Sequence, residues 1–269
     1  MKNKSIYRRE VRPKKSLGQH FLKDFSVAER IADVLSPFPD LPVLEVGPGT
    51  GILTQFLLKN KRDLTVVELD KDSVIYLDEH YPTLKGRIIE DDFLKMDLNA
   101  LFSDSFCVIG NYPYNISSQI FFKVLDYKHK IPCCAGMLQK EMAERMASRP
   151  GKKVYGIISV LLQTWYDIEY LFTVEPEVFD PPPKVKSGVV RITRNARTTL
   201  DCDESLFKTV VKTAFNQRRK TLRNSLKSLL GKESVISSLP VFDRRPEQLS
   251  VEEFIELTNI IVTSYPPAP

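Results

Sequence analysis

The sequence has little of what metal and redox sites require. Its 269 residues include only four cysteines and three histidines, the cysteines form no C-x-x-C pair, and the histidines are scattered. A bound metal is therefore not expected. Cys107 and the adjacent Cys133 and Cys134 lie in apolar runs, which favours buried, reduced thiols and a cytoplasmic compartment over a redox role.

Long hydrophobic runs are also missing. No stretch approaches the roughly 18 apolar residues of a membrane span, and no apolar stretch follows the charged N-terminus, so we expect no membrane association and no leader. The formal net charge is only +5, but the basic residues cluster. Seven of the first 15 residues are basic, and a second cluster spans residues 218–227. Such clusters suit a polyanionic partner.

Apolar runs of strand length alternate with helical patterns through the first half of the chain. A helix capped by Asp24 is predicted to end before Pro37. Five buried strands are predicted at Val43 to Val46, Leu64 to Leu69, Arg87 to Glu90, Phe106 to Gly110 and Cys133 to Leu138. Helical patterns between them include Ile120 to Leu125 and Lys140 to Ala147. This alternation predicts an α/β fold with a parallel, doubly wound sheet.

The pattern changes after residue 157. Long β-rich runs, interrupted by Pro181, Pro182 and Pro183, predict antiparallel closing strands at one edge of the sheet. The chain becomes helical after Thr199. We therefore expect two domains, a catalytic and cofactor-binding domain over residues 1–197 and a small all-helical domain over residues 198–269.

A glycine-rich turn follows the first buried strand. Gly47, Gly49 and Gly51 allow a tight turn and a close approach to a ligand at the carboxyl end of the sheet. Ile52 stands where a dinucleotide fingerprint has its third glycine, which disfavours NAD. Glu68 ends the second strand, where a carboxylate can accept hydrogen bonds from ribose hydroxyls, and Asp92 follows the third, where it can meet an adenine amine. The alternative is a plain tight turn with two solvated carboxylates.

The fourth strand leads into Asn111-Tyr112-Pro113-Tyr114. The lone pair of a purine amine is delocalised into the ring, so the amine is a poor nucleophile. The Asn111 side-chain oxygen and a backbone carbonyl held by the rigid Pro113 turn can accept its two hydrogens and localise the lone pair. Tyr114 can stack on an extruded base. These residues point to N-methylation of adenine, the alternative being an ordinary Asn-Pro turn above a packed tyrosine.

Six longer motifs resemble one family in order and spacing. They are KKSLGQHFL at 14–22, LEVGPGTG at 44–51, GNYPYNIS at 110–117, LQKE at 138–141, FDPPPKVKSGVVR at 179–191 and FNQRRKTLRNSL at 215–226. Together they resemble the ribosomal RNA adenine dimethyltransferase family from about residue 12 to 260. The resemblance implies a Rossmann-like S-adenosylmethionine-dependent methyltransferase domain followed by a helical domain. It also implies N6-dimethylation of two adjacent adenines in a hairpin near the 3′ end of 16S ribosomal RNA, during biogenesis of the 30S ribosomal subunit.

The resemblance also implies roles for individual residues. The cofactor contacts that it implies are Gln19, His20, Leu22, Gly47, Gly49, Glu68, Asp92 and Asn111. The catalytic residues that it implies are Asn111, Tyr112, Pro113, Tyr114 and Phe179, with Tyr114 and Phe179 sandwiching the target adenine. His20 replaces the asparagine common in the family, and Tyr112 replaces a leucine. We expect both departures to be compatible with activity.

Basic residues are expected to bind the RNA. Arg219, Arg223 and Lys227 recur every four residues and predict one stripe on a helix, beside an apolar stripe that seats it. This stripe, together with Arg218 and Lys220, is expected to contact phosphates, as are Lys14 and Lys15 near the N-terminus. A solvated charged helix face is the alternative. Because this surface is engaged by RNA, a monomer is expected.

Two other functions remain open from the sequence. A DNA adenine methyltransferase shares the amine-directed motif, although the basic helical tail favours RNA. A non-catalytic assembly or transcription accessory factor is the second, although the intact glycine loop, Asn111 and Tyr114 favour catalysis.

Overall fold

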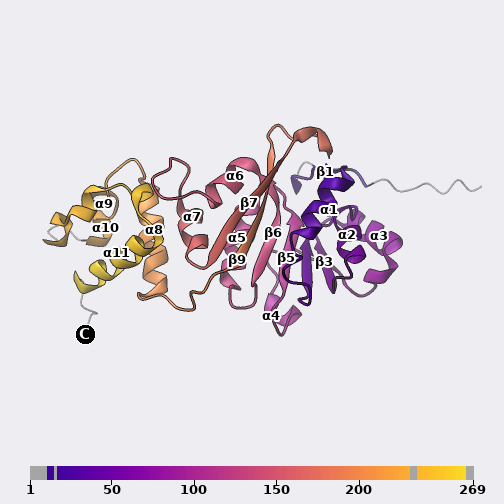
Figure 1. Ribbon diagram of the computed structural model, residues 1–269, viewed down its shortest axis with the longest axis horizontal. Coiled ribbons are helices and arrows are strands. Elements are labelled where there is room, and N and C mark those ends of the chain that lie inside the picture. The colour runs from indigo at the N-terminus through magenta and orange to yellow at the C-terminus, as the bar shows by residue number, and fades with distance from the viewer. Residues whose placement is uncertain (1–10, 15–16, 231–234, 265–269) are drawn as a thin grey trace, which may run out of the picture. The chain divides into compact units, whose positions relative to one another are not determined.

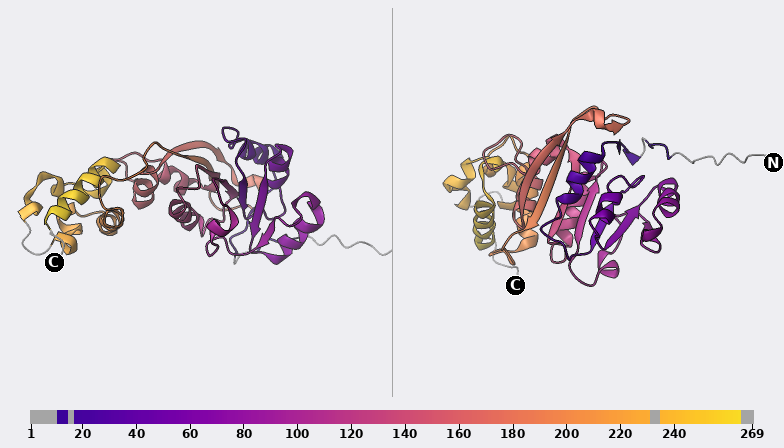
Figure 2. Two further views of the ribbon diagram at one scale, coloured as in Figure 1. Left: turned by 90° about the horizontal axis from the view of Figure 1, so that it is seen from below. Right: turned by 45° about the vertical axis from the view of Figure 1, so that its right-hand side comes forward.

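The chain folds into two compact units in a computed structural model that describes residues 11–14, 17–230 and 235–264. The first unit lies within residues 1–140 and 170–192, and the second within residues 141–169 and 193–269. In the sequence, the division falls within strands β7 (Tyr166–Val174) and β9 (Ser187–Arg194). Figures 1 and 2 show the strands and the C-terminal helices.

One large sheet has seven strands in the order β4-β3-β2-β5-β6-β9-β7. The pairs β4/β3, β3/β2, β2/β5 and β5/β6 are all parallel. The remaining bounds are β2 Val43–Val46, β3 Leu64–Glu68, β4 Ile88–Glu90, β5 Cys107–Asn111 and β6 Cys133–Gln139. The predicted doubly wound sheet is confirmed, and each of these five strands lies within one residue of its predicted bounds. The strand order reverses between β2 and β5, which is where open α/β sheets bind ligands.

Five helices of the first unit are α1 Phe25–Asp33, α2 Thr54–Lys59, α3 Lys71–His80, α4 Leu98–Leu101 and α5 Ser117–Asp126, and η2 spans Pro82–Leu84. Helix α1 begins where predicted, because the Asp24 carboxylate accepts the backbone N–H groups of Ser26 and Val27. Helix α3 is capped in the same way, because the Asp70 carboxylate accepts the backbone N–H of Asp72. A separate two-stranded ribbon joins β1 (Phe21–Leu22) to β8 (Phe179–Asp180), antiparallel, after the short η3 at Pro176–Val178.

Alternation along the strands divides the apolar side chains between the two faces of the sheet. Val43, Cys107 and Cys133 are register partners and belong to a core that includes the buried face of α1. Their neighbours along the strands point to the other face, where the Phe121 ring of α5 meets Tyr112 edge-on at 5.6 Å. The sheet is thus buried on both faces, as parallel sheets require.

One run predicted as strand is a helix. Residues Ile157–Gln163 form α7, so the β-rich prediction was wrong here. The five consecutive residues 158–162 are all buried, and a fully buried run shows neither helical nor strand alternation, so its period cannot distinguish the two. The start of α7 is fixed by Ser159, whose Oγ accepts the N–H of Gly156 and donates to the carbonyl of Arg145.

The C-terminal region is helical, as predicted, but its basic segment is not one helix. The bounds in the second unit are α6 Lys140–Met146, α8 Glu204–Asn216, α9 Leu222–Ser225, α10 Lys227–Leu230, η4 Val235–Ser238, η5 Pro240–Asp243, η6 Pro246–Gln248 and α11 Val251–Ser264. Residues 217–221 form a turn, because this polar stretch has no apolar side chain to bury, and Thr221 adopts an extended conformation before α9. The single stripe through Arg219, Arg223 and Lys227 was therefore wrong.

Packing of α8 on α11 gives the second unit its own core. Phe207, Val211 and Phe215 of α8 are buried, and the Phe215 ring lies 5.9 Å from that of Phe254 in α11. Burying each such side chain contributes about 1.5–3 kcal/mol. This core positions the basic segment that follows α8.

Three features of the described residues concern membrane spanning, metal binding and thiol chemistry. No helix among them is long and apolar enough to cross a membrane, and no three His, Cys, Asp or Glu side chains among them gather as metal ligands. Cys107, Cys133 and Cys134 are buried free thiols, which confirms the prediction from their apolar runs.

Candidate active site

A cavity of about 210 Å³ opens at the carboxyl ends of the central parallel strands. It lies at the reversal of strand order between β2 and β5, which is the expected ligand position. Its walls come from five chain segments, namely residues 17–21, 46–49, 67–69, 91–94 and 111–116. The cavity therefore brings together Gln19, His20, Gly47, Gly49, Glu68, Asp92, Asn111, Tyr112, Pro113 and Tyr114.

The glycine loop forms one corner of the cavity. Gly47 and Gly49 have φ angles of +69° and +56°, in the left-handed region that side chains rarely adopt. A β-carbon at Gly47 would meet no atom within 4 Å, whereas one at Gly49 would lie 2.9 Å from the Phe21 ring. The loop is thus open to a ligand at Gly47 and covered by the N-terminal segment at Gly49.

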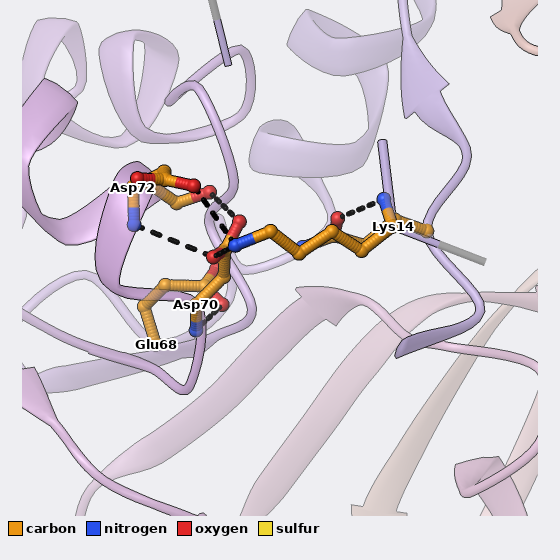
Figure 3. A network of polar contacts seen from close by, with 6 residues as sticks. Lys14, Glu68, Asp70 and Asp72 are labelled. Carbon is orange, nitrogen blue, oxygen red and sulfur yellow. Dashed lines mark hydrogen bonds and ion pairs between the residues drawn. The ribbon is translucent and has the colours of Figure 1, made fainter. Parts of the chain in front are cut away.

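Glu68 is held at the end of β3 by backbone donors. Its Oε2 accepts the N–H of Gly49 at 3.0 Å. Its Oε1 accepts the N–H of Asp70 at 2.9 Å (Figure 3). Burial raises the pKa of the Glu68 carboxyl above its usual range, although these hydrogen bonds oppose the shift. Each oxygen retains a second lone pair for a ligand hydroxyl.

Asp92 follows β4 on the wall beside Phe93 and Leu94. Its Oδ1 accepts the N–H of Leu94 at 3.0 Å, and its Oδ2 lies 3.4 Å from the Lys95 ammonium. The carboxylate is therefore oriented by its own turn while it faces the cavity.

The Asn111 side chain is oriented by the N-terminal segment. Its Nδ2 donates to the carbonyl of His20 at 3.2 Å, which fixes the amide and leaves Oδ1 as its acceptor. The His20 ring stacks on Tyr114, with centroids 5.6 Å apart and planes at 30°, and its Nδ1 donates to the Pro181 carbonyl at 2.8 Å. The Tyr114 hydroxyl lies 2.6 Å from the Ser187 Oγ. Both an oriented acceptor and a fixed aromatic ring are present.

Tyr112 is anchored beneath the site. Its ring is 1% exposed, and its hydroxyl donates to the Ala135 carbonyl at 2.7 Å. β-Carbons at Gly110 and Gly136 would approach this ring to 2.8 and 2.5 Å. The two glycines therefore make room for a tyrosine ring, which is larger than the leucine side chain common at this position in the family that the sequence resembles. No role was predicted for these glycines from the sequence.

Leu22 and Phe179 lie outside the cavity wall. They are register partners in the β1/β8 ribbon, are 4% and 1% exposed, and belong to the hydrophobic core. Gln19 lines the cavity, with its Oε1 accepting the backbone N–H of Lys14 at 2.8 Å. The structure thus places Gln19 at the cavity and Phe179 in the core beneath it.

The basic residues differ in what surrounds them. Arg219, Lys220 and Lys227 are exposed. Arg218 donates to the Lys153 carbonyl at 2.6 Å, and Arg223 pairs with Asp243 at 2.5 Å. Lys14 pairs with Asp70 and, at 2.9 Å, with Asp72, whereas Lys15 lies outside the described residues.

A second buried carboxylate lies behind the glycine loop. Glu45 of β2 is 1% exposed and accepts from the Thr54 hydroxyl at 2.7 Å. Burial raises the pKa of its carboxyl from 4.5 to about 8. The sequence signal for this residue is the single acid within the apolar run VLEV, and no role was predicted for it.

The cavity suits S-adenosylmethionine. Its carboxylates at two successive strand ends can accept hydroxyl and amine hydrogens, the open corner at Gly47 admits a ligand backbone, and Leu69, Phe93 and Leu94 offer apolar walls for a purine. The strand order and this cavity define a Rossmann-like methyltransferase that uses S-adenosylmethionine.

Comparison with known proteins narrows this class. The family described as ribosomal RNA adenine dimethylase matches residues 11–262. "Ribosomal RNA small subunit methyltransferase A" of Parabacteroides distasonis is 71% identical over 252 residues, covering 94% of this chain and 95% of the relative. The protein of that name from Porphyromonas gingivalis is 62% identical over 253 residues, covering 93% and 98%. The chain therefore belongs to the ribosomal RNA adenine dimethylase family.

Solved structures agree with the fold. A dimethyladenosine transferase from Plasmodium falciparum superposes with a TM-score of 0.76 at 22% identity, covering 91% of this chain and 98% of that one. The 23S rRNA methyltransferase ErmE gives a TM-score of 0.64 at 26% identity, covering 89% and 99%.

Proposed function

We propose that this chain transfers methyl groups from S-adenosylmethionine to the N6 amines of two adjacent adenines in a hairpin near the 3′ end of 16S ribosomal RNA. The substrate is the 30S ribosomal subunit or its precursor, and the product carries two methyl groups on each amine. The observation that carries the proposal is the oriented Asn111 amide, which shares one cavity with Gly47, Glu68 and Asp92.

The cofactor is held by groups at the strand ends. Glu68 accepts from the ribose hydroxyls, Asp92 accepts from the adenine amine of the cofactor, and Gly47 allows its methionine part to approach the backbone. Gln19 and His20 cover it from the N-terminal segment. When bound, the cofactor supplies an electrophilic methyl group.

The target amine is activated by acceptors and not by a base. Asn111 Oδ1 and the backbone carbonyl of Tyr112, held by Pro113, accept the two amine hydrogens and localise the nitrogen lone pair. A monomethylated amine has one hydrogen left and a dimethylated amine none, so the acceptors hold the final product poorly. Release of the product after the second transfer follows from this loss of partners.

Tyr114 and Phe179 are proposed to stack on the target adenine. Tyr114 already lines the cavity. Phe179 is buried in the core, so its contact with a base requires the β1/β8 ribbon to rearrange when RNA binds. Leu22, its register partner, would move with it as the cofactor cover.

The helical residues 198–269 are proposed to bind the RNA backbone, with residues 1–197 forming the catalytic domain. Arg219, Lys220 and Lys227 are exposed and suit phosphates. Arg218 and Arg223 contribute less, because each already has a protein partner. Lys15 joins them from the N-terminal segment, and Lys14 contributes little because two carboxylates match its charge. We further propose a cytoplasmic monomer.

The proposal is tested on small subunits that lack these modifications. They are incubated with isotopically labelled S-adenosylmethionine, and the digested RNA is analysed for labelled nucleosides by mass spectrometry. We expect label in N6,N6-dimethyladenosine, and a decrease of about 10²- to 10³-fold in the rate for Asn111→Ala, because an acceptor of the transition state is lost.

The matched control is Asn60→Ala. Asn60 is an exposed asparagine at the end of α2 that bonds Asp33 and does not line the cavity. Its variant should retain the full rate. Labelled N6-methyladenine in duplex DNA under the same conditions, with none in the subunits, would favour a DNA methyltransferase and refute the proposal.

A further inference from the structure

The N-terminal segment forms one wall of the cofactor cavity. Residues 17–21 line the cavity, and the Phe21 ring lies against the glycine loop at Gly49. At its far end the segment is fixed by the β1/β8 ribbon, where Lys23 also donates its N–H to the Val178 carbonyl at 2.8 Å. Something must also fix the near end if this wall is to stay closed over a ligand.

Lys14 is the residue at that near end. Its ammonium contacts Asp70 Oδ1 and Asp72 Oδ2, the latter at 2.9 Å (Figure 3). Its backbone carbonyl accepts the N–H of Leu17 at 3.0 Å, and its own N–H donates to Gln19 Oε1 at 2.8 Å. One residue therefore links the carboxylates by its side chain and the cavity wall by its backbone.

The carboxylates that receive Lys14 are themselves fixed to the cofactor site. Asp70 is 2% exposed, caps α3, and accepts from the Ser73 hydroxyl at 3.1 Å. Its backbone N–H donates to Glu68 Oε1, and Glu68 holds Gly49 through its other oxygen. A continuous chain of contacts thus runs from Lys14 to the glycine loop.

The charges favour this arrangement. Burial by itself would raise the pKa of the Asp70 carboxyl, but the bonds from Lys14, Ser73 and the Asp72 amide outweigh it and hold that pKa below its usual range. The Asp70 carboxylate is therefore ionised, and a buried carboxylate attracts an ammonium more strongly than an exposed one does.

We infer that the pairing of Lys14 with Asp70 and Asp72 is a clasp that holds residues 17–22 over the cofactor cavity. Lys14 is then a positioning residue for S-adenosylmethionine. The inference rests on the proposed function of the cavity. Its consequence is that Lys14 tightens cofactor binding in the absence of RNA, which a phosphate contact would not do.

The first measurement is the affinity of the RNA-free full-length chain for S-adenosylmethionine by isothermal titration calorimetry. Lys14→Met should raise the Kd about two- to fivefold, in the range of a partly exposed charge pair. Lys14→Arg should recover most of the affinity. Asp72→Asn should weaken binding less, and the double variant should bind no worse than Lys14→Met, because the two residues act through one contact.

Hydrogen exchange in the cofactor-free protein gives a second readout. The Leu17 amide, which donates to the Lys14 carbonyl, should exchange faster in Lys14→Met than in the wild type. Lys59→Met is the matched control, since Lys59 forms an exposed pair with Glu29 at 2.6 Å that joins α2 to α1 away from the cavity. It should change neither readout.

Unchanged cofactor affinity and unchanged exchange at Leu17 in Lys14→Met would overturn the clasp. Weaker RNA binding with a salt slope reduced by about one, at unchanged cofactor affinity, would also overturn it and assign Lys14 to a phosphate. If Lys14→Met does not fold, the same two measurements, cofactor affinity and exchange at the Leu17 amide, are made on Asp72→Asn. Failure of the proposed function is separate. If the cavity is not a cofactor site, the wild-type protein shows no S-adenosylmethionine binding, and if only the RNA substrate is wrong, it binds the cofactor but places no label in N6,N6-dimethyladenosine.

Discussion

The buried carboxyl groups of the first unit and the exposed cations of the second unit are two different uses of ionisable side chains. Glu45, Glu68 and Asp70 are at most 5% exposed, and backbone or hydroxyl donors fix each of them. Arg219 and Lys220 are exposed in a turn. Buried charge is costly unless it is partnered, whereas exposed charge is screened by salt. Substitutions in the first group should therefore have large effects that depend little on salt, and those in the second small effects that depend strongly on it.

The largest effect is expected at Glu68. In the wild type, both oxygens of the Glu68 carboxylate accept backbone N–H groups. Glu68→Gln keeps one of these acceptors, but its amide NH₂ is a donor and would face the other backbone N–H, which is also a donor. Losing a charge-assisted bond and leaving a donor unpaired should weaken S-adenosylmethionine binding about 10- to 100-fold, measured by calorimetry.

Glu90→Gln is the matched control for this change. Glu90 is the register partner of Glu68 on β4, yet it is exposed and does not line the cavity. It should bind the cofactor as the wild type does. A Glu68→Gln protein with wild-type affinity would show that burial does not distinguish these two carboxylates.

The next effect is a pH dependence of stability from Glu45. In the unfolded chain its carboxyl ionises near pH 4.5, whereas in the folded chain it stays protonated up to about pH 8. The unfolded state therefore loses the proton first, and stability falls as pH rises through this window. Glu45→Gln has no proton to lose and keeps an acceptor for Thr54.

Urea unfolding at several pH values measures this dependence. Glu45→Gln should flatten the fall between about pH 5 and pH 8, with a difference on the order of 2 kcal/mol at the upper end. Glu68 contributes a smaller fall of the same sign, because burial raises its pKa as well. Parallel curves for the variant and the wild type would mean that Glu45 is ionised in the folded protein.

The smallest effects are expected from the exposed cations. Arg219→Ala and Lys220→Ala should each weaken binding to a small-subunit RNA hairpin about threefold at moderate salt, and should each lower the salt slope by about one. Arg223→Ala should lower it less, since Asp243 matches that charge. Filter binding across a potassium chloride series makes the measurement.

Lys212→Ala is the control here, an exposed lysine of α8 outside the cluster. Its slope should equal that of the wild type. Equal slopes for all four variants would remove the contrast between the basic cluster and any other exposed charge of the second unit.

The convergence of the proposed cofactor residues on one cavity was predictable because sheet topology determines it. Glycines and carboxylates at the ends of apolar runs converge when those runs become parallel strands, so the positions of Gly47, Glu68 and Asp92 followed from the order of elements alone. The same reasoning placed Asn111 across the site. Local pattern and global fold agree in this region.

Other features depend on tertiary packing and could not be predicted from the sequence pattern. Residues 157–163 are mostly apolar and show no clear period. Because residues 158–162 are all buried, only tertiary packing determines that they form the short helix α7 and not a strand. The turn at 217–221 forms because the apolar residues of α8 and α9 on either side are buried in the core, whereas the polar residues between them are not. The Lys14 partners lie 56 and 58 positions away, a separation at which a single sequence gives no pairing signal, so Lys14 looked like one more member of a basic cluster.

The β1/β8 ribbon joins the proposed cofactor cover and the proposed base-stacking segment into a single mechanical unit. Phe21 and Leu22 are hydrogen-bonded in register with Asp180 and Phe179, and His20 adds a bond to Pro181. Whatever rearranges one strand therefore rearranges the other. By thermodynamic linkage, any factor by which the bound cofactor changes the affinity for RNA must equal the factor by which RNA changes the affinity for the cofactor. Two ligands of very different size would thus share one conformational equilibrium, set by a ribbon of four residues.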